Sequence, residues 1–116
     1  SGGMRQRCAL VRTLMTGKDL ILLDEPLSSL DAVTRLDLQD LLLELRRAYG
    51  KTIVMVTHDV EEALRLADEV VLLSSAPIAP VEIVRPSGMG PRPVDDPLWV
   101  RTKRRLVASL RREASR

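Results

Sequence analysis

Residues 19–31, DLILLDEPLSSLD, decide how this chain folds. Four apolar residues, 20–23, run without a polar break and end in two acids, Asp24 and Glu25, before Pro26. A short apolar run bounded by turn signals is typical of a strand buried on both faces, as in a parallel sheet. Carboxylates at the end of such a strand lie where open α/β sheets bind ligands. The stretch therefore predicts a strand with a candidate site at its end, although a solvated acidic turn would give the same pattern.

The segments around this strand alternate between helical and extended patterns. In order, we expect a helix over about 4–16, the strand 20–24, a helix over 32–49, a strand over 52–57, a helix ending near 67 and a strand over 69–74. Asp31 is a good N-cap and Gly50 a good stop for the second helix. This alternation predicts an α/β fold with a parallel sheet and right-handed crossovers.

The composition of the sequence changes after residue 75. Residues 76–97 hold six of the seven prolines, with room for one short strand over 81–84. Residues 98–116 carry seven Lys or Arg and one Glu, on a pattern that predicts an amphipathic helix over 98–112. We therefore divide the chain into a body (1–75), a connector (76–97) and a basic helix (98–116), whose outer face is either solvated or contacts acidic lipid headgroups or a membrane subunit.

Composition limits the classes of protein to which the chain can belong. With 116 residues it is one domain at most, and no apolar run is long enough to span a bilayer. The single cysteine, Cys8, cannot form an internal disulfide, which suits a reducing compartment. Aromatic residues make up 2% of the chain and its body has no basic stripe, so we expect no nucleic-acid partner.

Four short motifs follow one another along the body: SGGMRQR (1–7), LILLDEP (20–26), SSLD (28–31) and VTHD (56–59). In this order and spacing they resemble the signature motif, the Walker B strand, the D-loop and the switch-histidine loop of the ATP-hydrolysing subunit of ABC transporters. The resemblance implies a partial P-loop NTPase fold, the ABC ATPase fold, with parallel strands and flanking helices and with ATP and Mg²⁺ as cofactors.

The resemblance also implies roles for the polar residues at the ends of the strands predicted over 20–24 and 52–57. Asp24 would hold Mg²⁺, through a bound water, since Mg²⁺ takes few carboxylates and keeps several waters. Glu25 would orient and deprotonate the attacking water. His58, at the end of the second strand, would reach the γ-phosphate and help to position that water.

A second set of residues is implied to act on the nucleotide of a partner subunit. These are Ser1, Gly2, Gly3, Gln6 and Asp31. A glycine lets backbone approach a ligand closely, and a helix N-terminus favours phosphate. Two such subunits would sandwich two ATP molecules head to tail, as a homodimer or a pair of ATPase subunits. Asp31 is equally well explained as a helix N-cap, and both roles are compatible.

Within the ABC family, the sequences of these motifs are similar to those of bacterial importers of the nitrate, sulfonate and taurine group. That likeness implies integral membrane permease subunits as partners, and a periplasmic or lipoprotein substrate-binding protein in the full system. It also implies a peripheral location at the cytoplasmic face of the inner membrane.

The phosphate-binding loop G-x-x-x-x-G-K-[ST] does not occur in this sequence. We therefore expect the chain to be the C-terminal portion of such a subunit, with the N-terminal half absent, and to be inactive alone. Two alternatives remain open. One is a truncated, non-catalytic chain, and the other is an ABC-superfamily ATPase with no role in transport.

Overall fold

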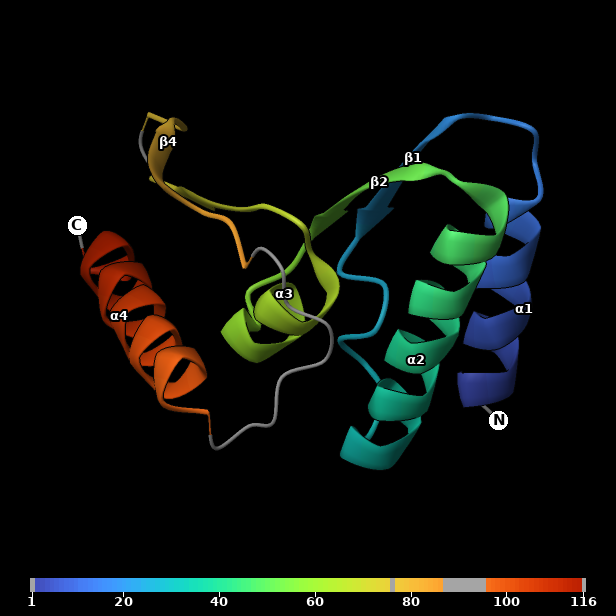
Figure 1. The fold of residues 1–116 in the computed structure, drawn as a ribbon, viewed down its shortest axis with the longest axis horizontal. Helices are drawn as coiled ribbons and strands as arrows, with labels where there is room; N and C mark the ends of the chain where they lie inside the picture. Colours follow the sequence, from blue (N-terminus) through green and yellow to red (C-terminus); the bar gives the residue numbers. More distant parts are fainter. Residues whose placement is uncertain (1, 76, 87–95, 116) are drawn as a thin grey trace. The chain divides into compact units, whose positions relative to one another are not determined.

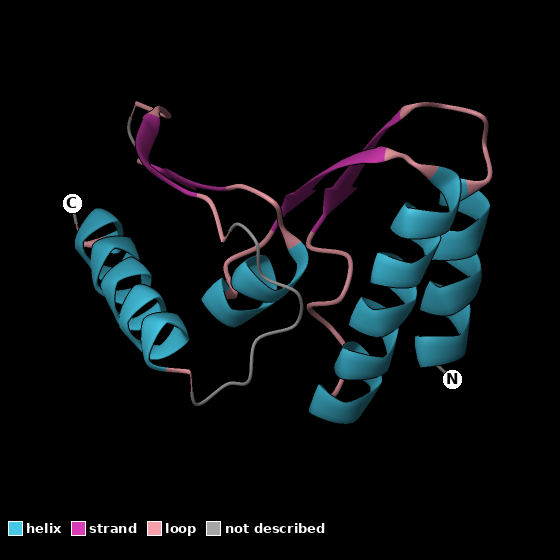
Figure 2. Ribbon diagram, in the orientation of Figure 1, coloured by secondary structure: helices cyan, strands magenta, loops and turns pink. Residues whose placement is uncertain are grey.

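The computed structural model describes residues 2–75, 77–86 and 96–115. Helices and strands alternate along the chain in these ranges (Figures 1 and 2). In order, they are α1 (Gly2–Leu14), β1 (Leu20–Asp24), α2 (Ala32–Tyr49), β2 (Thr52–Val56), α3 (Val60–Leu66), β3 (Val70–Leu73), β4 (Pro80–Val84) and α4 (Pro97–Ala114). Residues 1–58 and 59–116 form two units, each compact by itself.

The predicted elements are present, with small differences at their ends. The strand predicted over 20–24 and the helix predicted over 32–49 coincide with β1 and α2. The first helix begins at Gly2 rather than near residue 4, and the last extends from Pro97 to Ala114. The predicted connector, 76–97, contains β4, and most of its remainder lies outside the described residues. The division of the chain at residues 75 and 97 stays a prediction.

In the first unit, β1 and β2 form the expected parallel pair. Their register sets Ile21 beside Ile53 and Leu23 beside Met55, and α2 makes the crossover between them. Parallel neighbours need such a long connection, which this sequence provides as an 18-residue helix. The fold class predicted from the sequence, a small α/β fold with a parallel sheet and flanking helices, is confirmed.

The prediction that β1 is buried on both faces is wrong for the described chain. Ile21 is buried and Leu23 is half-buried, whereas Leu20 and Leu22 are 57% and 72% exposed. The same alternation continues on β2, where Val54 and Val56 are exposed. A parallel strand is buried on both faces only when elements cover both sides of its sheet, and here one face is open.

Helices α1 and α2 lie side by side, with their N-termini at the same end (Figure 1). The apolar side chains buried among the described residues of this unit are Leu10, Leu14, Ile21, Leu27, Leu38 and Leu42. The Asp31 carboxylate caps α2, and Gly50 ends it in the left-handed region with φ of 60°. Both helix-end predictions are therefore confirmed. Capping fixes where α2 begins, and with it the length of the loop that joins β1 to α2.

In the second unit, β3 pairs antiparallel with β4, a pairing that the sequence analysis did not predict. The physical reason is the short connection between the two strands. The Ser74 amide donates to the Ala79 carbonyl at 2.8 Å, next to the ends of the two strands. A connection this short can join antiparallel strands but not parallel ones. Helices α3 and α4 share a core of Leu64, Trp99 and Leu106.

Asp96 caps α4 and Pro97 occupies its first turn. The buried stripe of this helix runs through Trp99 and Leu106, while Leu98 is 45% exposed. Ion pairs at the surface join Arg105 to Glu82 at 3.1 Å and Lys103 to Glu61 at 3.4 Å. Among the described residues, no helix is both long and apolar enough to cross a membrane.

Candidate functional site

Glu25 follows β1 in a backbone conformation that is uncommon for its residue type. Its φ is 45°, in the left-handed region, while its amide donates to the Val56 carbonyl at 2.8 Å and so extends the ladder between the strands. Such a conformation costs roughly 1–3 kcal/mol and persists where surrounding contacts impose it. The Ser28 hydroxyl, 3.2 Å from the Glu25 carbonyl oxygen, supplies one such contact.

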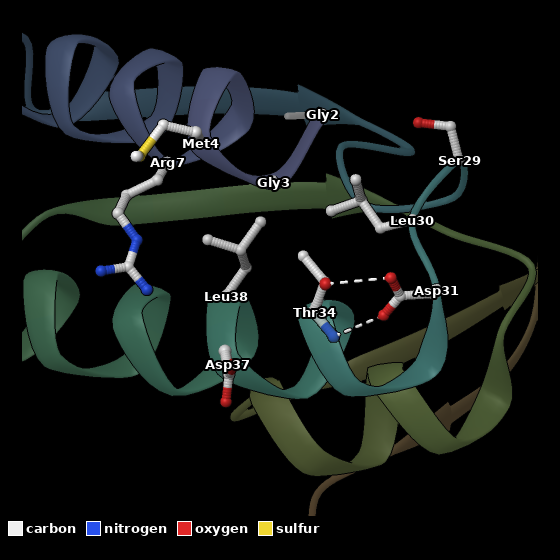
Figure 3. A pocket seen from close by; sticks show the side chains of 10 residues that line it. All are labelled: Gly2, Gly3, Met4, Arg7, Ser29, Leu30, Asp31, Thr34, Asp37 and Leu38. Atoms are coloured by element: carbon white, nitrogen blue, oxygen red, sulfur yellow. Dashed lines mark hydrogen bonds between the residues drawn. The ribbon is translucent and has the colours of Figure 1, made fainter.

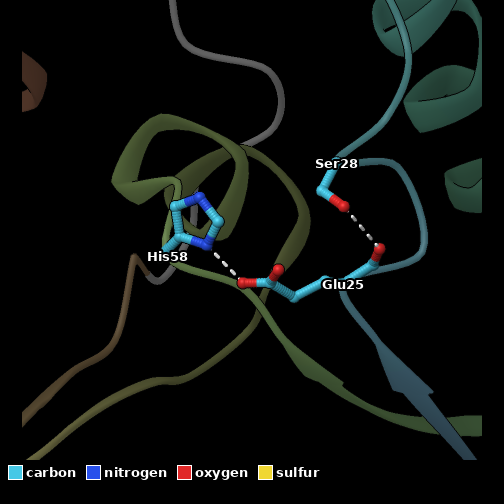
Figure 4. A network of polar contacts seen from close by, with 3 residues as sticks. All are labelled: Glu25, Ser28 and His58. Carbon is cyan, nitrogen blue, oxygen red and sulfur yellow. Dashed lines mark hydrogen bonds and ion pairs between the residues drawn. The ribbon is translucent and has the colours of Figure 1, made fainter.

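The Glu25 carboxylate contacts the His58 imidazole, through Oε1 and Nδ1 respectively. Figure 4 shows the carboxylate pointing toward the ring, while Ser28 approaches the Glu25 backbone from the other side. Because β1 and β2 are parallel, their carboxyl ends meet at one edge, and each residue lies just beyond its strand. The His58 side chain is 75% exposed and that of Glu25 is 35% exposed, so both are accessible from solvent. The fold thus brings together the two residues predicted to be catalytic.

Asp24 ends β1 on the open face of the sheet, opposite Val56. Its side chain is exposed and has no hydrogen bond or ion pair within the part of the chain that the structure describes. No cluster of three His, Cys, Asp or Glu side chains forms among those residues. Mg²⁺ bound with a nucleotide takes one or two carboxylates, and phosphate and water oxygens complete its shell. A single free carboxylate at a strand end fits that requirement.

Three of the residues implied to act on a partner's nucleotide line one surface depression, of about 390 Å³. Figure 3 shows Gly2 and Gly3 at the start of α1 facing Asp31 and Thr34 at the start of α2. The first turn of α1 holds no acidic residue, so the positive end of its dipole is not offset there. Ser1 lies outside the described residues.

The Asp31 carboxylate binds the first turn of the helix that it caps. Its carboxylate accepts the Thr34 amide at 2.8 Å and the Thr34 hydroxyl at 3.1 Å. The backbone hydrogen bond from Thr34, followed by the one from its hydroxyl, lowers the pKa of Asp31 below its ordinary value. The N-cap interpretation is therefore confirmed, while a role toward a partner's nucleotide stays a prediction.

Gln6 is half-buried and its side-chain amide donates to the Pro26 carbonyl. It does not line the depression that contains Gly2, Gly3 and Asp31. Within this structure it links α1 to the loop that follows Glu25, and its predicted place near a subunit interface stays untested.

Arg35 was missed by the sequence analysis. Its guanidinium donates to the Leu30 carbonyl at 2.7 Å and to the Leu27 carbonyl at 3.3 Å. The acceptors are backbone atoms, which leave no side-chain pattern in the sequence. The only available signal was the place of Arg35 in the first turns of a helix directly after the DEPLSSLD loop, close enough to fold back on it.

Gly3 is required by the packing of α1 against α2. A Cβ atom at this position would lie 2.5 Å from the Thr34 Cγ2 atom, and Thr34 cannot rotate away without losing its hydroxyl bond to Asp31. At Gly2 the nearest atom, Leu30 Cδ2, would be at an ordinary 3.7 Å. The two adjacent glycines therefore differ in what a side chain would encounter.

We expect Gly3→Ala to lower the free energy of unfolding by roughly 1–3 kcal/mol, because the added methyl group overpacks the contact between the helices. Gly2→Ala is the matched control and should be neutral or stabilising, since alanine favours a helix by about 1 kcal/mol over glycine. Urea unfolding of the full chain measures both. Gly3→Ala combined with Thr34→Ser, which removes Cγ2, should recover the stability; equal losses with and without Thr34→Ser would contradict the clash.

Known proteins that are similar to this chain are ATP-binding proteins of ABC transporters. The model of the ABC transporter family matches residues 1–28, which contain α1, β1 and Glu25. The chain is 44% identical over 110 residues to the aliphatic sulfonates import ATP-binding protein SsuB 1 of Pseudomonas savastanoi pv. phaseolicola, covering 95% of this chain and 46% of that protein. The chain is similar to the ATP-binding proteins of ABC transporters along most of its length.

Further ABC transporter relatives give the same result. The aliphatic sulfonates import ATP-binding proteins SsuB of Escherichia coli K12 and of Shigella flexneri are each 48% identical over 93 residues, covering 78% of this chain and 36% of theirs. The chain thus spans less than half the length of the curated relatives it matches. The described α/β architecture corresponds to part of the ABC ATPase fold.

Proposed function

We propose that this chain belongs to an ATP-hydrolysing subunit that energises solute import through a membrane permease. The observation that carries the proposal is the contact between the Glu25 carboxylate and the His58 imidazole at the carboxyl ends of two paired parallel strands. A carboxylate acting as base needs a fixed orientation and an open side from which water can approach, and this pair has both.

In the proposed reaction, Glu25 holds the attacking water and accepts its proton as oxygen bonds to the γ-phosphorus and the bond to the β-phosphate oxygen breaks. His58 fixes the direction of the Glu25 carboxylate and would reach the γ-phosphate of a bound nucleotide. Asp24 would hold Mg²⁺. When bound, MgATP supplies the phosphoryl group and the metal charge that offsets the negative charge of the phosphates.

The depression at the N-termini of α1 and α2 would act on a second nucleotide, held by a partner ATPase subunit. Gly2 supports this part of the proposal, because its missing side chain is not needed for packing and leaves the start of α1 open. Ser1 and Asp31 would complete the surface, and Gln6 would hold the adjoining loop. The assembly is then a pair of ATPase subunits related by a two-fold axis.

The names of the relatives direct the choice of transported solute. Because they are described as import proteins for aliphatic sulfonates, we propose an organic sulfonate as the first solute to test. Such a system would also contain integral permease subunits and a periplasmic or lipoprotein substrate-binding protein. The ATPase would be peripheral, at the cytoplasmic face of the membrane.

A chimera tests the proposal. In it, this chain replaces the matching 46% of the Pseudomonas savastanoi relative, and the remainder of that protein is kept. We expect the purified chimera to hydrolyse ATP in the presence of Mg²⁺, and cells that carry it in place of the relative to take up a radiolabelled alkanesulfonate. The unmodified relative is the positive control for both measurements.

The two readouts separate the parts of the proposal. Hydrolysis without uptake would retain the ATPase assignment and contradict the sulfonate importer. A folded chimera that binds ATP and does not hydrolyse it would contradict the ATPase assignment, and would favour the alternative of a non-catalytic chain.

A further inference from the structure

The loop between β1 and α2 is held from both neighbouring helices. From α2, the Arg35 guanidinium donates to the carbonyls of Leu27 and Leu30, at 3.3 and 2.7 Å. From α1, the Gln6 amide donates to the carbonyl of Pro26. Leu27 itself is completely buried. A surface loop with three carbonyls bound by side chains and one fully buried anchor has little freedom to move.

Hydrogen bonds inside the loop carry this constraint back to Glu25. The Leu30 amide donates to the Leu27 carbonyl at 3.2 Å, and the amide and hydroxyl of Ser28 both reach the Glu25 carbonyl, at 3.4 and 3.2 Å. Glu25 has the positive φ of 45°, a conformation that surrounding contacts must impose. The fixed loop is therefore the structure that can impose it.

The chemistry of the Arg35 side chain suits this task. A guanidinium presents several N–H donors in a rigid fork, so one side chain can bind two carbonyls three residues apart. Lysine offers a single compact ammonium on a flexible stem and cannot reproduce both bonds in the same geometry. Arg35 is half-buried, which keeps these bonds partly out of competition with water.

We propose that Arg35 is a positioning residue for Glu25. Through the loop of residues 26–30 it holds the Glu25 backbone in its left-handed conformation, and so keeps the carboxylate directed at His58. Gln6 provides the second attachment of the loop, from α1. Because Gly2 and Gly3 begin the same helix, this attachment links the depression that they line to Glu25. The catalytic part of the inference rests on the proposed ATPase function, whereas the conformational part does not.

The conformational part is tested first, on the full chain, by hydrogen exchange of the Ser28 and Leu30 amides. Arg35→Ala should speed their exchange at least tenfold, because Ser28 and Leu30 lie in the loop that Arg35 holds. Arg47→Ala is the matched control, since Arg47 is exposed near the end of the same helix. It should leave both amides unchanged. Unchanged exchange in Arg35→Ala would overturn the proposal.

The catalytic part is tested in the chimera. Arg35→Ala should lower kcat for ATP hydrolysis about 10- to 100-fold, as expected for a displaced catalytic group, while KM for ATP changes less than twofold. Arg35→Lys should recover only part of the loss, and millimolar guanidinium should raise the rate of Arg35→Ala but not of Arg47→Ala. This chemical rescue distinguishes positioning from a general loss of stability.

Each outcome decides between the two proposals. A parent chimera that hydrolyses ATP, together with an Arg35→Ala variant of full kcat, would overturn the role of Arg35 and leave the ATPase assignment intact. A parent chimera without activity would contradict the ATPase assignment, and the amide exchange of the full chain would then decide whether Arg35 holds the loop. If Arg35→Ala does not fold, Arg35→Lys takes its place in both the exchange and the kinetic measurements. An Arg35→Lys variant with the amide exchange and the kcat of the parent would overturn the proposal.

Discussion

Replacing Glu25 by glutamine is expected to lower kcat of the chimera by about 10²–10⁴-fold, the usual contribution of a positioned general base. Glutamine has nearly the same shape and retains an oxygen that can contact His58, but it cannot accept the proton of the attacking water. Binding of MgATP should be retained, because Glu25 is not proposed to hold the metal. Steady-state hydrolysis and equilibrium binding of a fluorescent ATP analogue measure the two quantities.

The control for this variant is Glu44→Gln, the same chemical change at an exposed position on α2. It should leave kcat within twofold of the parent. Substitution of Glu25 by aspartate adds a second comparison, since it keeps the acid but shortens the side chain and withdraws it from His58. A Glu25→Gln chimera with more than a tenth of the parental kcat would remove Glu25 from the role of base.

The sequence predicted the parts of this fold that depend on local pattern. The apolar run 20–23, the capping residue Asp31 and the stop at Gly50 were sufficient to place β1 and α2, because helix caps and buried strands have short-range signatures. The order of strand, helix and strand was sufficient for the parallel pairing of β1 with β2. That pairing in turn brings Glu25 to His58, although they are 33 positions apart along the chain.

Features that depend on what covers a surface were not predictable in this way. The run of apolar residues in β1 indicated burial on both faces, yet Leu20 and Leu22 are exposed. An apolar pattern indicates that a face is suited to burial, but it does not show whether another element covers that face. The hairpin of β3 and β4 was also not predicted, because it depends on the short connection that brings the two strands together and not on the pattern of either strand.

The details of the site that the sequence did not reveal all involve backbone atoms. Arg35 binds two carbonyls, Gln6 binds a third, and Glu25 has a positive φ. Every residue has a carbonyl, so these acceptors leave no trace in residue type. Glu25 is identified as a candidate by its motif, but the means of holding it in place becomes visible only in three dimensions.

His58→Ala is the second substitution with a large expected effect, a fall in kcat of about 100-fold in the chimera. Alanine leaves the Glu25 carboxylate free to rotate, since His58 is the side chain that it contacts. The Glu25 side chain is 35% exposed, so water can occupy the vacated space, and ATP affinity should change little. His58→Gln should retain more activity than alanine, because its amide can still donate to the carboxylate.

A double-mutant cycle shows whether the two residues act as a unit. If His58 works by orienting Glu25, then His58→Ala should add almost nothing to the loss already caused by Glu25→Gln, because there is no base left to orient. If His58 acts on the phosphate independently, the two losses should multiply, and the double variant would fall about 100-fold below Glu25→Gln alone. The first result is expected from the direct contact between the side chains, and multiplication would separate the two roles.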